Sequence, residues 1–64
     1  MDNLYWFTNE EGENVLPDFY GTEKEVVEYT EEQSKILNET IYINCGEDII
    51  DCIYPWNLLF PMEV

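Results

Sequence analysis

The strongest constraint on the fold is a β-hairpin pattern in residues 40–54. Residues 40–45 and 48–54 are rich in β-branched and aromatic side chains, and Gly46-Glu47 separates them. A two-residue loop with glycine first favours a type II′ turn, whose twist matches that of the flanking strands. Such a turn fixes the strand register. The predicted pairs are Cys45 with Asp48, Ile43 with Ile50, and Ile41 with Cys52.

This register also predicts which side of the hairpin faces the core, because side chains alternate between the two faces of a strand. The predicted core face consists of Ile41, Ile43, Ile50, Cys52 and Tyr54. The opposite face consists of Tyr42, Asn44, Ile49, Asp51 and Ile53. That second face is less polar than a fully solvated one should be. The following segment, residues 55–61, could cover it.

A second hairpin is expected near the start of the chain. Residues 4–8 and 15–20 have β-favouring composition, and a polar stretch at 9–14 separates them. Pro17 has no backbone donor, which places the second strand at a sheet edge or at a bulge.

Between the two hairpins the sequence predicts a helix from Glu23 to about Asn38. Thr22 and Glu25 have the spacing of a capping box, in which each side chain bonds the other residue's free amide group. The apolar stripe of this segment is thin in the middle. A second capping pattern at residues 30–33 leaves open an alternative, in which a strand at 25–29 precedes a shorter helix.

The predicted class is therefore α+β: an antiparallel four-stranded sheet with one helix, in the order ββαββ. The 64 residues form one domain, residues 1–64, with an expected radius of gyration of about 11 Å. A chain this short buries only ~60% of its unfolded surface, so a deep substrate cavity is hard to build.

Charge is the best clue to function. Fifteen acidic residues face two lysines, with no arginine or histidine, and the formal net charge is -13. Such a surface attracts positive partners over long distances, at the cost of self-repulsion. It also keeps many small proteins soluble, so solubility alone is the competing interpretation.

The acidic residues form several groups along the chain. Glu25, Glu28, Glu32 and Glu39 follow three- and four-residue steps along one side of the predicted helix, as a row of phosphates would. Lys35 interrupts the row, and Glu31 is placed to pair with it in the ordinary helical manner. Further groups lie at the predicted turns: Glu10, Glu11 and Glu13; Asp18; and Glu47, Asp48 and Asp51. If these groups join in one surface, the protein presents a larger anionic face than solubility requires. If they are scattered, the hypothesis that its charge imitates a row of phosphates loses most of its support.

Chemistry other than binding is poorly supported. Cys45 and Cys52 are about 13 Å apart in the predicted register, too far for a disulfide. Two cysteines without histidine do not make a structural zinc site. The single serine, Ser34, has no histidine to activate it. We therefore expect no enzyme activity and no metal or cofactor.

Aromatic residues supply the core and, where exposed, contacts to a partner. Tyr29, Tyr42 and the region of Trp56 are the candidates for such contacts.

The N-terminus lacks the pattern of a signal peptide, and no apolar run approaches the ~20 residues that a membrane span requires. We expect a cytoplasmic protein that does not bind anionic membranes, which would repel it.

In size and composition the whole chain resembles the phage-encoded DNA-mimic inhibitors, a class that includes anti-CRISPR proteins and uracil-DNA glycosylase inhibitors. No single motif carries this resemblance. It implies an inhibitor that occupies the nucleic-acid channel of a host defence or repair protein, with carboxylates meeting the lysines and arginines that normally hold phosphates. The expected partner is thus a basic nucleic-acid-binding protein, and direct binding to nucleic acid is not expected. The predicted contacts are Glu25, Glu28, Glu32, Glu39, Glu47, Asp48, Asp51, Tyr29 and Tyr42.

The alternative is a small adaptor or regulatory domain that binds a protein through apolar surface, with the acidic residues serving solubility. Its contacts would be Leu58, Leu59, Phe60 and Met62, and a homodimer is possible.

Overall fold

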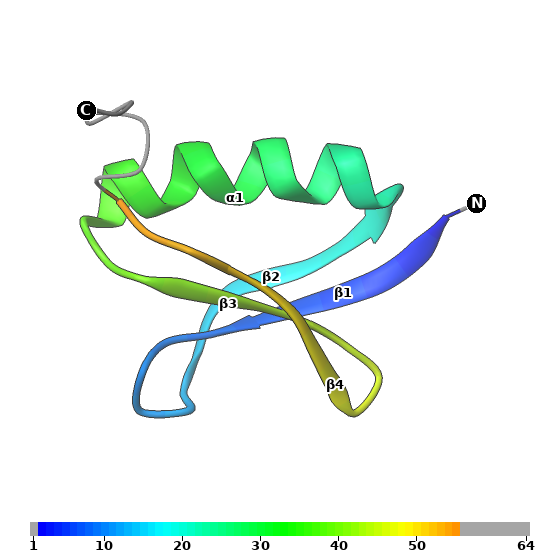
Figure 1. The fold of residues 1–64 in the computed structure, drawn as a ribbon, viewed down its shortest axis with the longest axis horizontal. Helices are drawn as coiled ribbons and strands as arrows, with labels where there is room; N and C mark the ends of the chain where they lie inside the picture. Colours follow the sequence, from blue (N-terminus) through cyan, green and yellow to red (C-terminus); the bar gives the residue numbers. More distant parts are fainter. Residues whose placement is uncertain (1, 56–64) are drawn as a thin grey trace, which may run out of the picture.

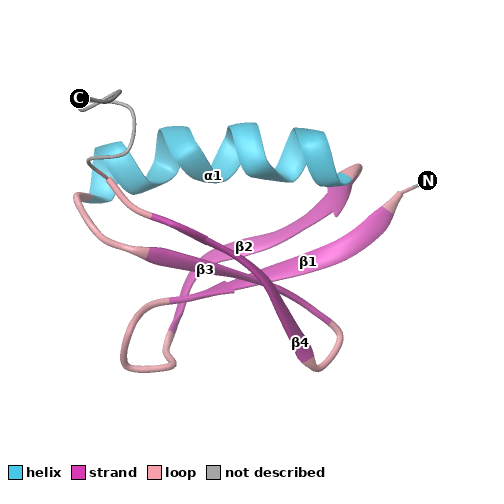
Figure 2. Ribbon diagram, in the orientation of Figure 1, coloured by secondary structure: helices cyan, strands magenta, loops and turns pink. Residues whose placement is uncertain are grey.

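The computed structural model describes residues 2–55 of the chain. Within that part, a four-stranded antiparallel sheet carries one helix across it, as Figure 1 and Figure 2 show. The elements are β1 (Asn3–Thr8), β2 (Asn14–Gly21), α1 (Glu23–Leu37), β3 (Ile41–Cys45) and β4 (Asp48–Ile53). The strands lie in the order β2-β1-β3-β4, so the two hairpins meet through β1 and β3. The predicted α+β class and element order are confirmed.

Helix α1 begins at the predicted capping box. The Thr22 hydroxyl accepts a hydrogen bond from the Glu25 amide at 3.2 Å, and the Glu25 carboxylate accepts one from the Thr22 amide at 3.0 Å. The helix ends at Leu37, and Asn38 follows it in the left-handed conformation, with φ 57° and ψ 43°. One continuous helix is thus confirmed, and the alternative with a strand at residues 25–29 is wrong.

Strand β2 is an edge strand with a bulge at Pro17, as predicted. Tyr5 of β1 pairs with Phe19, whereas Phe7 pairs with Leu16, so β2 carries one extra residue between these two pairs. Because proline cannot donate to a sheet ladder, this is a position that tolerates it.

The predicted register of the second hairpin is correct only next to its turn. Cys45 pairs with Asp48, and Gly46 has the positive φ, 65°, that a type II′ turn wants at its first position. The register then shifts. Ile43 pairs with Asp51 rather than Ile50. Ile41 likewise pairs with Ile53 rather than with Cys52.

Ile50 is an extra residue on β4, with no partner on β3. The side chains of β4 that follow it therefore point to the face of the sheet opposite to the predicted one. Ile53, predicted on the outer face, is buried in the core. Ile50 and Tyr54, predicted in the core, are exposed, and Cys52 is half-buried. The physical reason is that isoleucines at 49, 50 and 53 put apolar side chains on both faces, so alternation alone does not choose between them.

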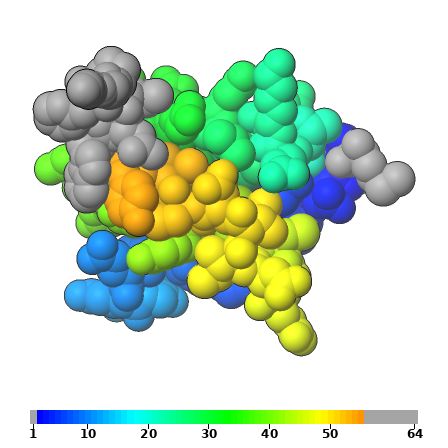
Figure 3. All heavy atoms as spheres, viewed as in Figure 1, coloured from blue at the N-terminus to red at the C-terminus, as the bar shows by residue number. Residues whose placement is uncertain are grey.

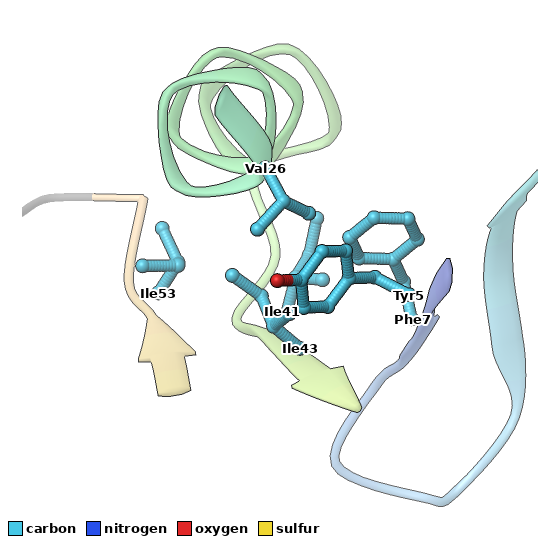
Figure 4. Packing of buried hydrophobic residues seen from close by; sticks show 6 residues of the cluster. All are labelled: Tyr5, Phe7, Val26, Ile41, Ile43 and Ile53. Atoms are coloured by element: carbon cyan, nitrogen blue, oxygen red, sulfur yellow. The ribbon is translucent and has the colours of Figure 1, made fainter. Parts of the chain in front are cut away.

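The core lies between α1 and one face of the sheet, and Figure 4 shows Val26 pointing from the helix toward the strand side chains. Its buried members are Tyr5, Phe7, Val26, Ile41, Ile43 and Ile53. Two further buried positions of the helix, Thr30 and Ser34, are polar but satisfied, because their hydroxyls donate to the helix carbonyls of Val26 and Glu31 at 2.6 and 3.1 Å. These small side chains occupy the thin part of the predicted stripe.

Candidate functional site

The outward face of α1 carries a row of carboxylates. Glu25, Glu28 and Glu32 are all exposed, whereas the buried residues of the helix lie on its other side. With a rise of about 1.5 Å per residue, the row extends about 10 Å along the axis. The structure thus places these three predicted contacts together, pointing away from the sheet.

The first member of the row is fixed in place by the helix cap. The Glu25 carboxylate accepts the Thr22 amide hydrogen, and this bond holds the side chain over the first turn. Negative charge at a helix N-terminus is stabilising, because it faces the positive end of the helix dipole.

The predicted fourth member, Glu39, lies past the end of the helix and lines a hollow of about 460 Å³. The same hollow is lined by Glu10 and Glu11 of the β1–β2 loop. Figure 1 shows this loop and the C-terminal end of α1 on the same side of the molecule. The hollow is lined by Asn9, Glu10, Glu11, Asn38, Glu39, Thr40 and Pro55.

The β1–β2 loop holds its carboxylates on a defined scaffold. The side-chain oxygen of Asn9 accepts hydrogen bonds from the amides of Glu11 and Glu13, at 2.9 and 3.0 Å. The Asn9 amide donates to the Glu13 carbonyl at 2.9 Å, and Gly12 takes the positive φ that closes the turn. An asparagine that bonds amides further along the chain in this way is typical of tight loops.

We call six exposed carboxylates the acidic ridge. Three lie on the outward face of α1, and three line the hollow near the C-terminal end of the helix: Glu25, Glu28 and Glu32, and Glu39, Glu10 and Glu11. The sequence placed Glu10 and Glu11 in a separate group. Their position beside Glu39 depends on the pairing of β1 with β3, which local sequence patterns do not reveal.

The remaining predicted carboxylates lie elsewhere. Glu47 and Asp48 are exposed at the β3–β4 turn, which Figure 1 shows at the edge of the molecule away from α1. Figure 3 shows this turn and the β1–β2 loop as separate projections. Asp51 is exposed on β4, where its carboxylate accepts a hydrogen bond from the Cys52 amide at 2.8 Å. These residues form a second acidic group, distinct from the ridge.

Neither lysine forms an ion pair with a carboxylate of the ridge within residues 2–55. Lys24 and Lys35 are exposed, and within residues 2–55 neither forms an ion pair, including the helical pair of Lys35 with Glu31 that the sequence suggested. The carboxylates of the ridge are therefore available to a cation from outside the chain.

The two tyrosines predicted as contacts lie in different environments. Tyr29 is half-buried on α1, stacked on Phe19 with ring centroids 4.8 Å apart and tilted against Phe7 at 5.7 Å. Its ring is thus used in packing. Tyr42 lies on the side of the sheet away from α1, paired with Thr8 of β1 and with Cys52 of β4. Trp56 lies outside the described residues.

Around Tyr42 the structure gathers groups that the sequence did not connect. Partial burial raises the pKa of Tyr42, and the nearby Cys52 and Glu10 raise it further. A hydrogen bond with Cys52 raises the pKa of Tyr54. Both phenols are therefore neutral at neutral pH, where lysine and arginine are charged.

Features of other kinds of site are few. Among residues 2–55, no three or more side chains of His, Cys, Asp or Glu are grouped so as to hold a metal ion. Both thiols are free, and they belong to opposite faces of the sheet, since Cys45 packs against the core and Cys52 pairs with Tyr42. In the same part of the chain, no helix has the length and apolar character needed to cross a membrane.

Comparisons with protein-family models, with curated proteins and with solved structures found no match to this chain.

Proposed function

We propose that this protein is a nucleic-acid mimic that binds and blocks the basic nucleic-acid site of a host defence or repair protein, in the manner of the anti-CRISPR class. The observation that carries this proposal is the acidic ridge, with three exposed carboxylates on the outward face of α1 and three at the hollow, none of which forms an ion pair with a lysine within residues 2–55. A groove lined with lysines and arginines would accept such a ridge in place of phosphates.

The charge density of the molecule supports this proposal. The longest principal extent of the molecule is 34 Å. A B-DNA duplex of that length carries about 20 phosphate charges, at one per ~1.7 Å of axis. The chain carries a net charge of -13, which is about two thirds of the charge of the polymer that it would replace.

The role is one of binding rather than catalysis. The ridge carboxylates are exposed, whereas acid–base catalysis needs paired carboxylates in environments that separate their pKa values. The proposal requires no cofactor. Direct binding to nucleic acid or to anionic membranes is disfavoured, because both carry the same sign of charge as the protein. The proposed location is the cytoplasm of a bacterial host, where such targets act.

Capture from a bacterial lysate tests the proposal. The full chain is immobilised and compared with a ridge variant, Glu25→Gln with Glu28→Gln and Glu32→Gln, and with a control that removes the same charge from the β3–β4 hairpin, Glu47→Gln with Asp48→Asn and Asp51→Asn. Glutamine preserves the shape of glutamate and its capping bond, so the fold is retained.

The expected result is a nucleic-acid-binding protein that is held at low salt, released at high salt and retained less by the ridge variant than by the hairpin control. Screening over a Debye length of about 3 Å in 1 M salt explains the release. A captured protein that is indifferent to salt and to the ridge substitutions would refute the proposal.

One observation favours the alternative of an adaptor that binds through apolar surface. Several large apolar side chains are exposed on the strands, among them Leu4, Tyr20 and Ile49, at 55, 69 and 62%. The C-terminal contacts first predicted for an adaptor, residues 58–62, lie outside the described residues. An adaptor would hold its partner at high salt, which separates it from a mimic in the same experiment.

A further inference from the structure

The sheet has an apolar face that α1 does not cover. Side chains alternate along the strands, so the residues between the core positions point away from the helix. We call this surface the helix-free face, and it consists of Leu4, Trp6, Tyr20, Tyr42, Ile49 and Tyr54. Large apolar side chains that are exposed on the same face of a sheet mark an interaction site more often than singly scattered ones do.

Trp6, near the middle of this face, is held in place by a hydrogen bond. Its indole N–H donates to the Gly46 carbonyl at 3.2 Å, so the side chain reaches from β1 to the turn that follows β3. The side chain of Asn44 lies opposite Trp6 and is 5% exposed. Its amide nitrogen donates to the carbonyls of Trp6 and Tyr42, at 3.3 and 3.1 Å. The aromatic rings therefore project from a braced surface rather than from a loop.

Acidic side chains border the helix-free face at two places. Glu10 lies close enough to Tyr42 and Tyr54 to raise the pKa of both phenols. Glu47 follows Gly46, whose carbonyl accepts the indole N–H of Trp6. Aromatic rings with carboxylates at the border attract a cation in two ways, through the negative ring faces and through direct charge.

The net charge of the chain also limits which kind of molecule can bind the helix-free face. A second copy of the chain would bring another -13 to the same border, and a nucleic acid or an anionic lipid surface would be repelled in the same way. A cationic protein segment is attracted. Arginine fits this surface better than lysine does, because its planar guanidinium stacks on aromatic rings while it forms paired hydrogen bonds with a carboxylate.

We propose that the helix-free face binds an arginine-bearing segment of a protein partner, with guanidinium groups stacked on the rings of Trp6, Tyr20 and Tyr42 and paired with the bordering carboxylates. This inference concerns a surface other than the acidic ridge and follows from the chain's own charge and geometry, so it stands or falls separately from the function proposed above.

Peptide titration followed by NMR tests the inference. The full chain, labelled with ¹⁵N, is titrated with a blocked octa-arginine peptide and, separately, with a blocked octa-lysine peptide. We expect octa-arginine to shift the Trp6 indole signal and the amide signals of β1, β3 and β4 that belong to the helix-free face. We also expect it to bind about two- to five-fold more tightly than octa-lysine.

Two kinds of variant separate stacking from general charge attraction. Tyr42→Leu removes a ring, and Tyr20→Leu does the same at a position that is 69% exposed and costs the fold little. Each should bring the arginine preference closer to one. Glu28→Gln with Glu32→Gln is the matched control, because it should weaken both peptides equally and leave the preference unchanged.

Three outcomes would overturn the inference. The first is equal affinity for the two peptides, with shifts confined to the outward face of α1. The second is a dimer of the free chain whose interface is the helix-free face. The third is contact of residues 56–64 with Trp6 and Tyr42 in the free chain. If octa-arginine binds this face and the lysate yields no nucleic-acid-binding protein, the inference holds and the proposed function fails.

Discussion

Neutralising the middle of the acidic ridge should make the protein more stable. Glu28 and Glu32 stand one helical turn apart on the outward face of α1, and each also lies within three or four residues of other charged groups. In the variant Glu28→Gln with Glu32→Gln, three like-charge neighbour pairs disappear: 25 with 28, 28 with 31, and 28 with 32. Two attractive pairs, 24 with 28 and 32 with 35, are lost as well.

The magnitude follows from these pairs. Each helical neighbour pair contributes about 0.2–0.5 kcal/mol, so a net loss of one repulsive pair stabilises the fold by about that amount at low salt. Neither lysine forms an ion pair within residues 2–55, so the attractive pairs contribute at the low end of the range. For a domain of this size, 0.2–0.5 kcal/mol corresponds to a rise of about 1 to 4 °C in Tm.

Thermal unfolding followed by circular dichroism measures this effect. The rise in Tm should be present in 10 mM salt, where the Debye length is about 30 Å, and should shrink in 1 M salt, where it is about 3 Å. Ile36→Val, an exposed change on the same helix that leaves charge unaltered, is the control. A fall in Tm, or a rise that is the same at both salt concentrations, would refute the view that the ridge is a site of net repulsion.

Further predictions concern the fold that presents the ridge. Thr22→Ala removes the hydroxyl that caps α1 and should cost about 1 kcal/mol in urea unfolding, whereas no loss would mean that the cap does not hold the helix. Ile41→Val should cost about 0.5–1.5 kcal/mol because Ile41 is fully buried, while Ile36→Val should stay within about 0.5; equal costs would contradict the assigned core. Because Tyr42 and Tyr54 have pKa values above the ordinary 10.0 in the folded state, their contribution to stability is complete below pH 10 and is lost as pH rises through the folded-state values. Phenylalanine at both positions should flatten this alkaline decline, and an unchanged decline would contradict the assignment.

Local sequence chemistry accounts for much of the fold. The capping box at Thr22, the turn at Gly46 and the bulge at Pro17 each follow from the conformational demands of a few adjacent residues, and each is present in the structure. The pairing of β3 with β4 beyond the Asn44–Ile49 pair could not be predicted, because isoleucines suit both faces of the sheet. The packing of Ile53 under α1 selects the bulged pairing.

Part of the candidate site could likewise be predicted from local sequence, and part depends on contacts between distant parts of the chain. Three members of the predicted row, Glu25, Glu28 and Glu32, follow from helical periodicity, which is a local property, whereas Glu39 lies past the end of the helix. Bringing Glu39 together with Glu10 and Glu11 requires β1 to pair with β3, a contact between distant parts of the chain. The separation of Glu47 from the ridge has the same origin. Tertiary pairing, rather than composition, decides which carboxylates share a surface.

Competition with DNA tests the central claim most directly. The affinity of the chain for its captured partner is measured at increasing concentrations of duplex DNA, at one fixed salt concentration. If the acidic ridge occupies the nucleic-acid site, the apparent Kd should rise in proportion to DNA concentration once the DNA exceeds its own Kd. An apparent Kd that stays constant, with chain, partner and DNA found in one complex, would contradict the claim.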